Sequence, residues 1–180
     1  MMRDPFGGRS LAGSGRGPRN GLANTRRPQP PVKVTGWTVA KFLDEVVERT
    51  RGFLPPERRD FADVRHWGLL KLSYGDPQIH YEVGVRKRTG RVEVGLHFEA
   101  DHATNAALLQ HFDDHVIPIK ATLGERFEVE AWDRGWARIY TLVPVTRLDD
   151  DLADRTAELL SDAIDFLQPI LEEVGGEPKP

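Results

Sequence analysis

Apolar residues recur along this chain with two periods, one of three to four residues and one of two. The longer period is typical of helices that bury one face, and the shorter of half-buried strands. Helical spacing follows Thr38, a typical N-cap, and stops near Gly52, which predicts a first helix. A last helix is expected to begin after the acidic stretch RLDDD, whose charges suit a helix N-terminus, and to fray at Gly175.

A third helical pattern carries the following apolar positions: Leu108, Phe112, Val116, Ile119 and Leu123. Asp101 or Thr104 is expected to cap this helix, and Gly124 to end it. Pro118 lies inside the pattern, where it removes an amide donor and crowds the preceding turn. We therefore expect the helix to be kinked or interrupted.

Alternation of apolar and polar residues is clearest in residues 80–99, which predict a hairpin. With Thr89 and Gly90 as its turn, Gly84 lies opposite Gly95. One face of the hairpin then consists of apolar side chains only: Tyr81, Val83, Val85, Val94, Leu96 and Phe98. Because a one-residue slip would destroy this sorting, we expect this register.

Residues 126–144 predict a second hairpin around a three-residue loop, 133–135. This pairing puts Trp132 opposite Trp136. The face away from the core then carries aromatic and charged side chains: Trp132, Trp136, Tyr140, Arg138, Glu128 and Glu130.

One more short strand is expected over residues 70–74, so the predicted element order is α-βββ-α-ββ-α. This order predicts the α+β class, with a five-stranded, mainly antiparallel sheet and helices packed on one face. The order resembles the type III secretion chaperone-like fold, a family of small dimeric binding proteins. The resemblance is one of topology, and no motif carries the chaperone function across.

Composition divides the chain into three segments. Residues 1–33 are rich in Gly, Pro and Arg and have almost nothing to bury, so we expect a disordered basic tail. Residues 34–174 are expected to form one α+β domain, and residues 175–180 a disordered end. Residues 1–31 carry six arginines and one aspartate, so a net charge of −3 for the whole chain leaves −8 for the rest. The tail is either a tether for an anionic partner or a passive leader.

Three function classes are disfavoured by composition. No apolar run approaches the ~18 residues that span a bilayer, and no signal peptide is recognisable, so we expect a cytoplasmic protein without a membrane partner. The absence of cysteine excludes disulfides, thiolate metal ligands and cysteine nucleophiles. The acidic body repels nucleic-acid phosphates, although a basic tail can contact them.

A set of segments in residues 68–171 supports a second resemblance: RVEVGLHFE, NAALLQHF, LGERFEVEAW, ARIYTLVP and FLQPIL. Together they resemble an uncharacterised bacterial domain often found beside restriction-type nuclease modules, for which Arg138, Ile139 and Tyr140 are the most diagnostic positions. The resemblance implies a module that works beside DNA-processing enzymes, and it does not imply catalysis by this module. Glu82 and Glu93 each lack the lysine two places on that such nucleases use beside Mg²⁺.

Four of the six histidines lie in residues 97–115. His111 and His115 stand four apart, and H-x-x-D-H is similar to the inverted zinc-protease motif H-x-x-E-H. A zinc site needs a third protein ligand, and none is identified, so we favour flank histidines on a core helix and expect no metal or cofactor. The two hairpin histidines are expected to form ion pairs or hydrogen bonds across the strands: His97 with Glu82, and His80 with Glu99.

The outer face of the sheet is the strongest candidate for a binding surface, because exposed aromatic rings beside arginines often mark a contact. Two opposed glycines are expected to add a strip of bare backbone. The candidate residues are Trp132, Trp136, Tyr140, Arg138, Gly84, Gly95, Arg86 and Arg88. Alternatively, the N-terminal segment covers this face, the rings only stiffen the hairpin, or the face forms a homodimer interface.

The sequence therefore favours a non-catalytic, homodimeric binding module that contacts a protein through its outer face. The first alternative is an accessory domain of a restriction or defence system that contacts DNA through the basic tail and a hairpin tip. Aromatic rings on a sheet also stack single-stranded bases, but the carboxylates of this face repel phosphate. An enzyme, such as a metal-dependent hydrolase using His111 and His115, is the least supported reading, because no set of base, nucleophile and oxyanion donors is visible.

Overall fold

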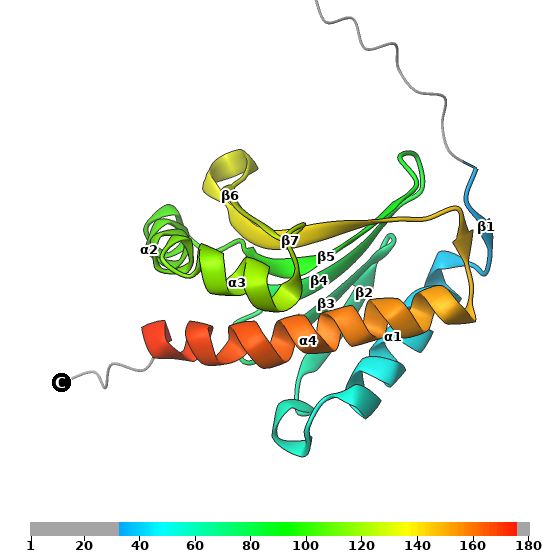
Figure 1. Cartoon of the computed structure of the whole chain (residues 1–180), viewed down its shortest axis with the longest axis horizontal. Helices are drawn as coiled ribbons and strands as arrows, with labels where there is room; N and C mark the ends of the chain where they lie inside the picture. Colours follow the sequence, from blue (N-terminus) through cyan, green and yellow to red (C-terminus); the bar gives the residue numbers. More distant parts are fainter. Residues whose placement is uncertain (1–32, 176–180) are drawn as a thin grey trace, which may run out of the picture. The chain divides into compact units, whose positions relative to one another are not determined.

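The structure is a computed structural model that describes residues 33–175 (Figure 1). The terminal segments expected to be disordered lie almost wholly outside these residues. Along the chain the elements are β1 (Thr35–Gly36), α1 (Val39–Phe53), η1 (Pro56–Arg58), β2 (Ala62–His66), β3 (Leu69–Ser73), β4 (Ile79–Arg86), β5 (Arg91–Phe98), α2 (His102–Asp113), α3 (Val116–Leu123), β6 (Glu128–Ala131), η2 (Asp133–Gly135), β7 (Ala137–Pro144), β8 (Arg147–Leu148) and α4 (Asp150–Gly175).

Six strands form one antiparallel sheet in the order β2-β3-β4-β5-β7-β6, and β1 pairs with β8 in a separate two-stranded parallel sheet. The predicted α+β class is confirmed, with one strand more in the main sheet than expected. The additional strand, β2, lies at the edge of the sheet, and all its side chains except that of Asp63 are exposed. An exposed edge strand does not need alternating apolar residues, so its sequence, ADVRH, carries no strand period.

α1 and α2 begin at capping residues that the sequence predicts. The Thr38 hydroxyl accepts a hydrogen bond from the Lys41 amide at the start of α1, and Asp101 caps α2. The expected interruption of the long helix is confirmed, since α2 ends at Asp113 and α3 begins at Val116. The break precedes Pro118 because a proline ring crowds the carbonyl four residues earlier, whereas proline fits the first turn of a new helix, where amides lack partners.

The core lies between the helices and one face of the sheet. The buried side of β4 and β5 consists of the apolar residues predicted for it, and the Phe98 ring stacks on Phe112 of α2 with centroids 5.6 Å apart. α1 and α4 lie side by side below the sheet, with α3 on the same side (Figure 1). No helix of residues 33–175 has the length and apolar character of a transmembrane span.

The two hairpins differ in how well their registers were predicted. The pairing of β6 with β7 is confirmed, including Glu130 opposite Arg138. The predicted register of β4 and β5 is wrong by two residues: His80 lies opposite His97, and Gly84 lies opposite Glu93. The connection is a four-residue turn, 87–90, in place of two residues. A shift of two keeps every side chain on its face, so the core was predicted correctly although the pairs were not.

Candidate functional site

The outer face of the six-stranded sheet is the side away from the core, and no helix of the described part packs on it (Figure 1). The strand registers arrange its residues in rows that run across the sheet. Three such rows are Leu69, Gly84, Glu93 and Leu142; Val64, Lys71, Glu82, Gly95, Tyr140 and Glu128; and His80, His97, Arg138 and Glu130.

Four ionisable side chains at the centre of this face are buried, although the sequence predicts an open polar surface. They belong to His80, Glu82, Glu93 and His97, and each of these residues as a whole is at most 4% exposed. The two imidazole rings stack with centroids 5.8 Å apart, and the Trp132 ring meets His97 edge-on at 5.7 Å. Ionisable groups are rarely buried unless they are paired, so this cluster requires partners.

Three cationic side chains, those of Lys71, Arg86 and Arg138, surround the buried carboxylates. Lys71 lies 2.9 Å from Glu99 and 3.8 Å from Glu82, and Arg86 lies 3.6 Å from both Glu82 and Glu93. Burial by itself would raise the pKa of the Glu82 carboxyl, but His80, His97 and Lys71 outweigh it and hold the pKa below its ordinary value. Glu82 is therefore a carboxylate at neutral pH.

Arg138 connects the cluster to the aromatic residues of the second hairpin. Its guanidinium lies 3.1 Å from Glu93 and 2.6 Å from Glu130, 3.8 Å over the Tyr140 ring and 4.6 Å over the Trp132 ring. Burial opposes a carboxylate at Glu93, but nearby His97, Arg138 and Arg86 lower the pKa of Glu93 overall. Arg138 and Trp132, predicted as free binding groups, are thus largely occupied by contacts within the chain.

The structure separates the other predicted surface residues. Gly84 and Gly95 are not opposed, so no strip of bare backbone forms. A Cβ atom at Gly95 would lie 2.2 Å from the Ile139 carbonyl oxygen, so this glycine permits close approach of β5 and β7. Arg86 faces the buried carboxylates, whereas Arg88 is exposed at the hairpin turn.

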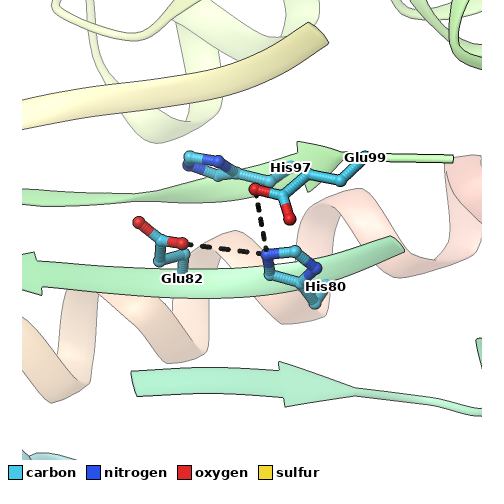
Figure 2. A group of neighbouring side chains, drawn as sticks. All are labelled: His80, Glu82, His97 and Glu99. Carbon is cyan, nitrogen blue, oxygen red and sulfur yellow. Dashed lines mark ion pairs between the residues drawn. The ribbon is translucent and has the colours of Figure 1, made fainter. Parts of the chain in front are cut away.

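Within residues 33–175, two groups of side chains have ligand atoms close enough to hold a metal ion. The first is His80, Glu82, His97 and Glu99, whose ligand atoms lie within 4.8 Å of one another. Figure 2 shows the His80 ring between the carboxylates of Glu82 and Glu99, with His97 on the neighbouring strand. The expected pair of His97 with Glu82 across the strands does not form, because His97 faces Glu93 at 3.4 Å. His80 does face Glu99, at 4.0 Å.

The second group contains His111 and His115, together with Glu173 of α4 as the third residue that the sequence did not identify. The histidine nitrogens of this group are less available to a metal ion, because they lie within hydrogen-bond distance of backbone carbonyl oxygens. The Nε2 atom of His111, which lies 3.8 Å from Glu173, also lies 3.2 Å from the Ile170 carbonyl oxygen. A nitrogen that donates to a carbonyl has no lone pair for a metal.

A further cavity of about 460 Å³ lies between the sheet and the ends of α2 and α4. Its lining is mostly apolar, as in many small-molecule sites. The Tyr81 hydroxyl donates to the Gln168 side chain, so two of its polar groups are already paired.

Comparison with protein-family models, with curated proteins and with solved structures found no match to this chain. The resemblances to a restriction-associated domain and to a chaperone-like fold therefore stay predictions from the sequence.

Proposed function

We propose that this chain is a non-catalytic binding module that self-associates through its outer face. The observation that carries the proposal is that this face combines exposed apolar side chains with charges already paired within the chain. Val64 and Leu142 are 60% and 36% exposed on opposite sides of the buried cluster, and the Tyr140 ring lies half-buried beside Leu142.

Internal pairing of the charges favours association. A partner that covers an unpaired carboxylate must remove its hydration, which costs several kcal/mol per ion. On this face Glu82 and Glu93 have already lost most of their hydration in the single chain. A second copy therefore gains the burial of the apolar residues without that cost. Tyrosine, tryptophan and arginine are also the residues enriched at the centres of interfaces.

The test uses two exposed residues that the fold does not need. We expect wild-type protein to be dimeric by multi-angle light scattering across a hundredfold concentration range. Val64→Glu combined with Leu142→Glu places like charges in a two-fold interface, so it is expected to give monomers. Trp132 is less suitable, because its ring packs against His97 and Arg138 and its loss would disturb the buried cluster.

A matched control is Ile117→Glu, since Ile117 is 79% exposed on α3, away from the outer face. This variant is expected to remain dimeric. Circular dichroism verifies that all variants are folded. Monomeric wild type over the whole range, or a dimeric Val64→Glu/Leu142→Glu variant, contradicts self-association through this face.

One observation favours the second candidate, DNA contact at the tip of the β4–β5 hairpin. Lys87, Arg88 and Arg91 are exposed there, and none forms an ion pair within residues 33–175. Phosphate contacts by such residues release counterions, so affinity falls as salt rises. Fluorescence anisotropy with duplex DNA measures this affinity at several salt concentrations. We expect Arg88→Ala, which removes one phosphate contact, to reduce the slope of log K against log salt concentration by roughly one unit. A binding curve that does not move with salt contradicts this candidate.

A further inference from the structure

One ring nitrogen of His80 forms a hydrogen bond, and the other faces two carboxylates. Its Nδ1 atom lies 2.9 Å from the Pro77 carbonyl oxygen. A carbonyl only accepts, so Nδ1 carries the proton, and in the neutral ring Nε2 then bears a lone pair. Nε2 is buried, has no hydrogen-bond partner among residues 33–175, and lies 3.8 Å from Glu82 Oε2 and 4.0 Å from Glu99 Oε1. A lone pair that faces two carboxylates is unfavourable unless a proton or a metal cation lies between them.

His97 adds a second candidate ligand nitrogen to the same group of side chains. The ring is fully buried, and neither of its nitrogens has a hydrogen-bond partner in the described part of the chain. Buried polar atoms without partners are uncommon in folded proteins, and a bound ion is one physical explanation for them. Two imidazoles and two carboxylates, from β4, β5 and the residue that follows β5, thus have their ligand atoms within 4.8 Å of one another (Figure 2).

We propose that His80, Glu82, His97 and Glu99 bind one divalent transition-metal ion, with Zn²⁺ as the best match. Zinc takes four nitrogen or oxygen ligands at about 2.0–2.2 Å, which puts tetrahedral neighbours about 3.3–3.6 Å apart. The 3.8 and 4.0 Å separations around His80 exceed this by less than about 1 Å, within the reach of side-chain rotation. Glu82 and Glu99 supply two negative charges next to the ion, which they share with Lys71 and Arg86. Imidazole ligands favour zinc over Mg²⁺ or Ca²⁺.

The groups around the four ligands suit this role. Metal-binding histidines usually donate their second ring N–H to a carbonyl or carboxylate, which fixes the ring. His80 has the Pro77 carbonyl for this purpose, and His97 Nε2 lies 3.4 Å from Glu93, which Arg138 holds. Lys71 bonds Oε2 of Glu99, so Oε1 is left facing His80. This site does not depend on self-association, since all four residues belong to one chain.

The experiment is calorimetric titration of ZnCl₂ into tag-free full-length protein that has first been stripped with a chelator. We expect one Zn²⁺ per chain, a tetrahedral Co²⁺ absorption band on cobalt substitution, and a rise in Tm. At zinc concentrations near 100 times Kd, the expected rise for a chain of this size is roughly 5–10 °C. Glu82→Gln keeps the side-chain shape but removes a charged ligand, so it is expected to weaken binding by about a hundredfold or more.

The matched control removes the other histidine group. His111→Ala combined with His115→Ala is expected to leave the stoichiometry, the cobalt band and the affinity unchanged. If Glu82→Gln does not fold, as judged by circular dichroism, Glu99→Gln at the more exposed edge of the site takes its place. The proposal is overturned if stripped wild type takes up no Zn²⁺, if the carboxylate variants bind as tightly as wild type, or if the control variant alone loses binding.

Discussion

Arg138 offers the sharpest test of how the buried cluster on the outer face is held together. Its guanidinium is the nearest cation to Glu93, whose side chain is only 6% exposed. Removing one partner of a buried pair generally costs 3–5 kcal/mol. Arg86 remains 3.6 Å from Glu93, so we expect Arg138→Met to lower the free energy of unfolding by about 2–3 kcal/mol at pH 7. In a chain of this size that corresponds to a fall in Tm of about 5–10 °C.

The loss is expected to depend on pH. Folding lowers the pKa of Glu93, so its contribution to stability is complete above the unfolded value of about 4.3. The contribution is lost as the pH falls through the folded value. Urea unfolding of metal-free protein is therefore expected to show a difference between wild type and Arg138→Met that shrinks by more than about 1 kcal/mol between pH 7 and pH 3.

Two comparisons separate this explanation from a simple loss of packing. In a Glu93→Gln background there is no buried charge to compensate, so Arg138→Met is expected to cost at least about 1 kcal/mol less. Arg155→Met breaks a surface pair with Asp151 and is expected to cost under about 0.5 kcal/mol. A pH-independent loss, or additive effects of the Arg138 and Glu93 substitutions, would refute the ion-pair explanation.

Three further predictions concern the fold and are measured as changes in the urea midpoint at constant m-value. Gly95→Ala is expected to cost about 1–3 kcal/mol or more, because the new Cβ atom would overlap Ile139 and Tyr140; an unchanged midpoint contradicts the close approach of β5 and β7. Thr38→Ala is expected to cost about 1 kcal/mol, and Thr38→Ser almost nothing, because only the hydroxyl caps α1. Phe112→Ala is expected to cost about 3–5 kcal/mol, since the ring is fully buried on the sheet; a loss below ~1 kcal/mol contradicts this packing.

Sequence pattern predicts which side of a strand a residue occupies better than it predicts the neighbour across the strands. The β4–β5 hairpin sorts correctly into apolar and polar faces with either a two-residue or a four-residue turn, because both keep the same parity. Only the backbone of residues 87–90 decides between them. The stacking of His80 on His97 follows from that choice, so it was not predictable from periodicity.

Burial of the outer-face charges was also missed, because polar alternation is ordinarily typical of a solvated surface. The signal lay in the composition of that face: His80, Glu82, Glu93 and His97 alternate with apolar residues on two adjacent strands. Paired acids and histidines at this density predict a network rather than scattered surface groups. The sequence instead drew attention to His111 and His115, where helical spacing resembles a metal motif. Their third neighbour, Glu173, comes from α4, and no local pattern predicts such a long-range contact.

The side-by-side packing of α1 and α4 has a consequence for biosynthesis. The buried face of α1 is completed by α4, and Arg49 pairs with Asp150, which lies 101 residues later in the chain. At translation rates of about 5–20 residues per second, α1 waits roughly 5–20 s for the residues that begin its partner helix. During that interval its apolar side chains have no final packing partner. The nascent chain is therefore most exposed to misassociation before α4 leaves the ribosome. Fusion or truncation at the α4 end is expected to lower soluble yield more than a change in the β4–β5 turn does.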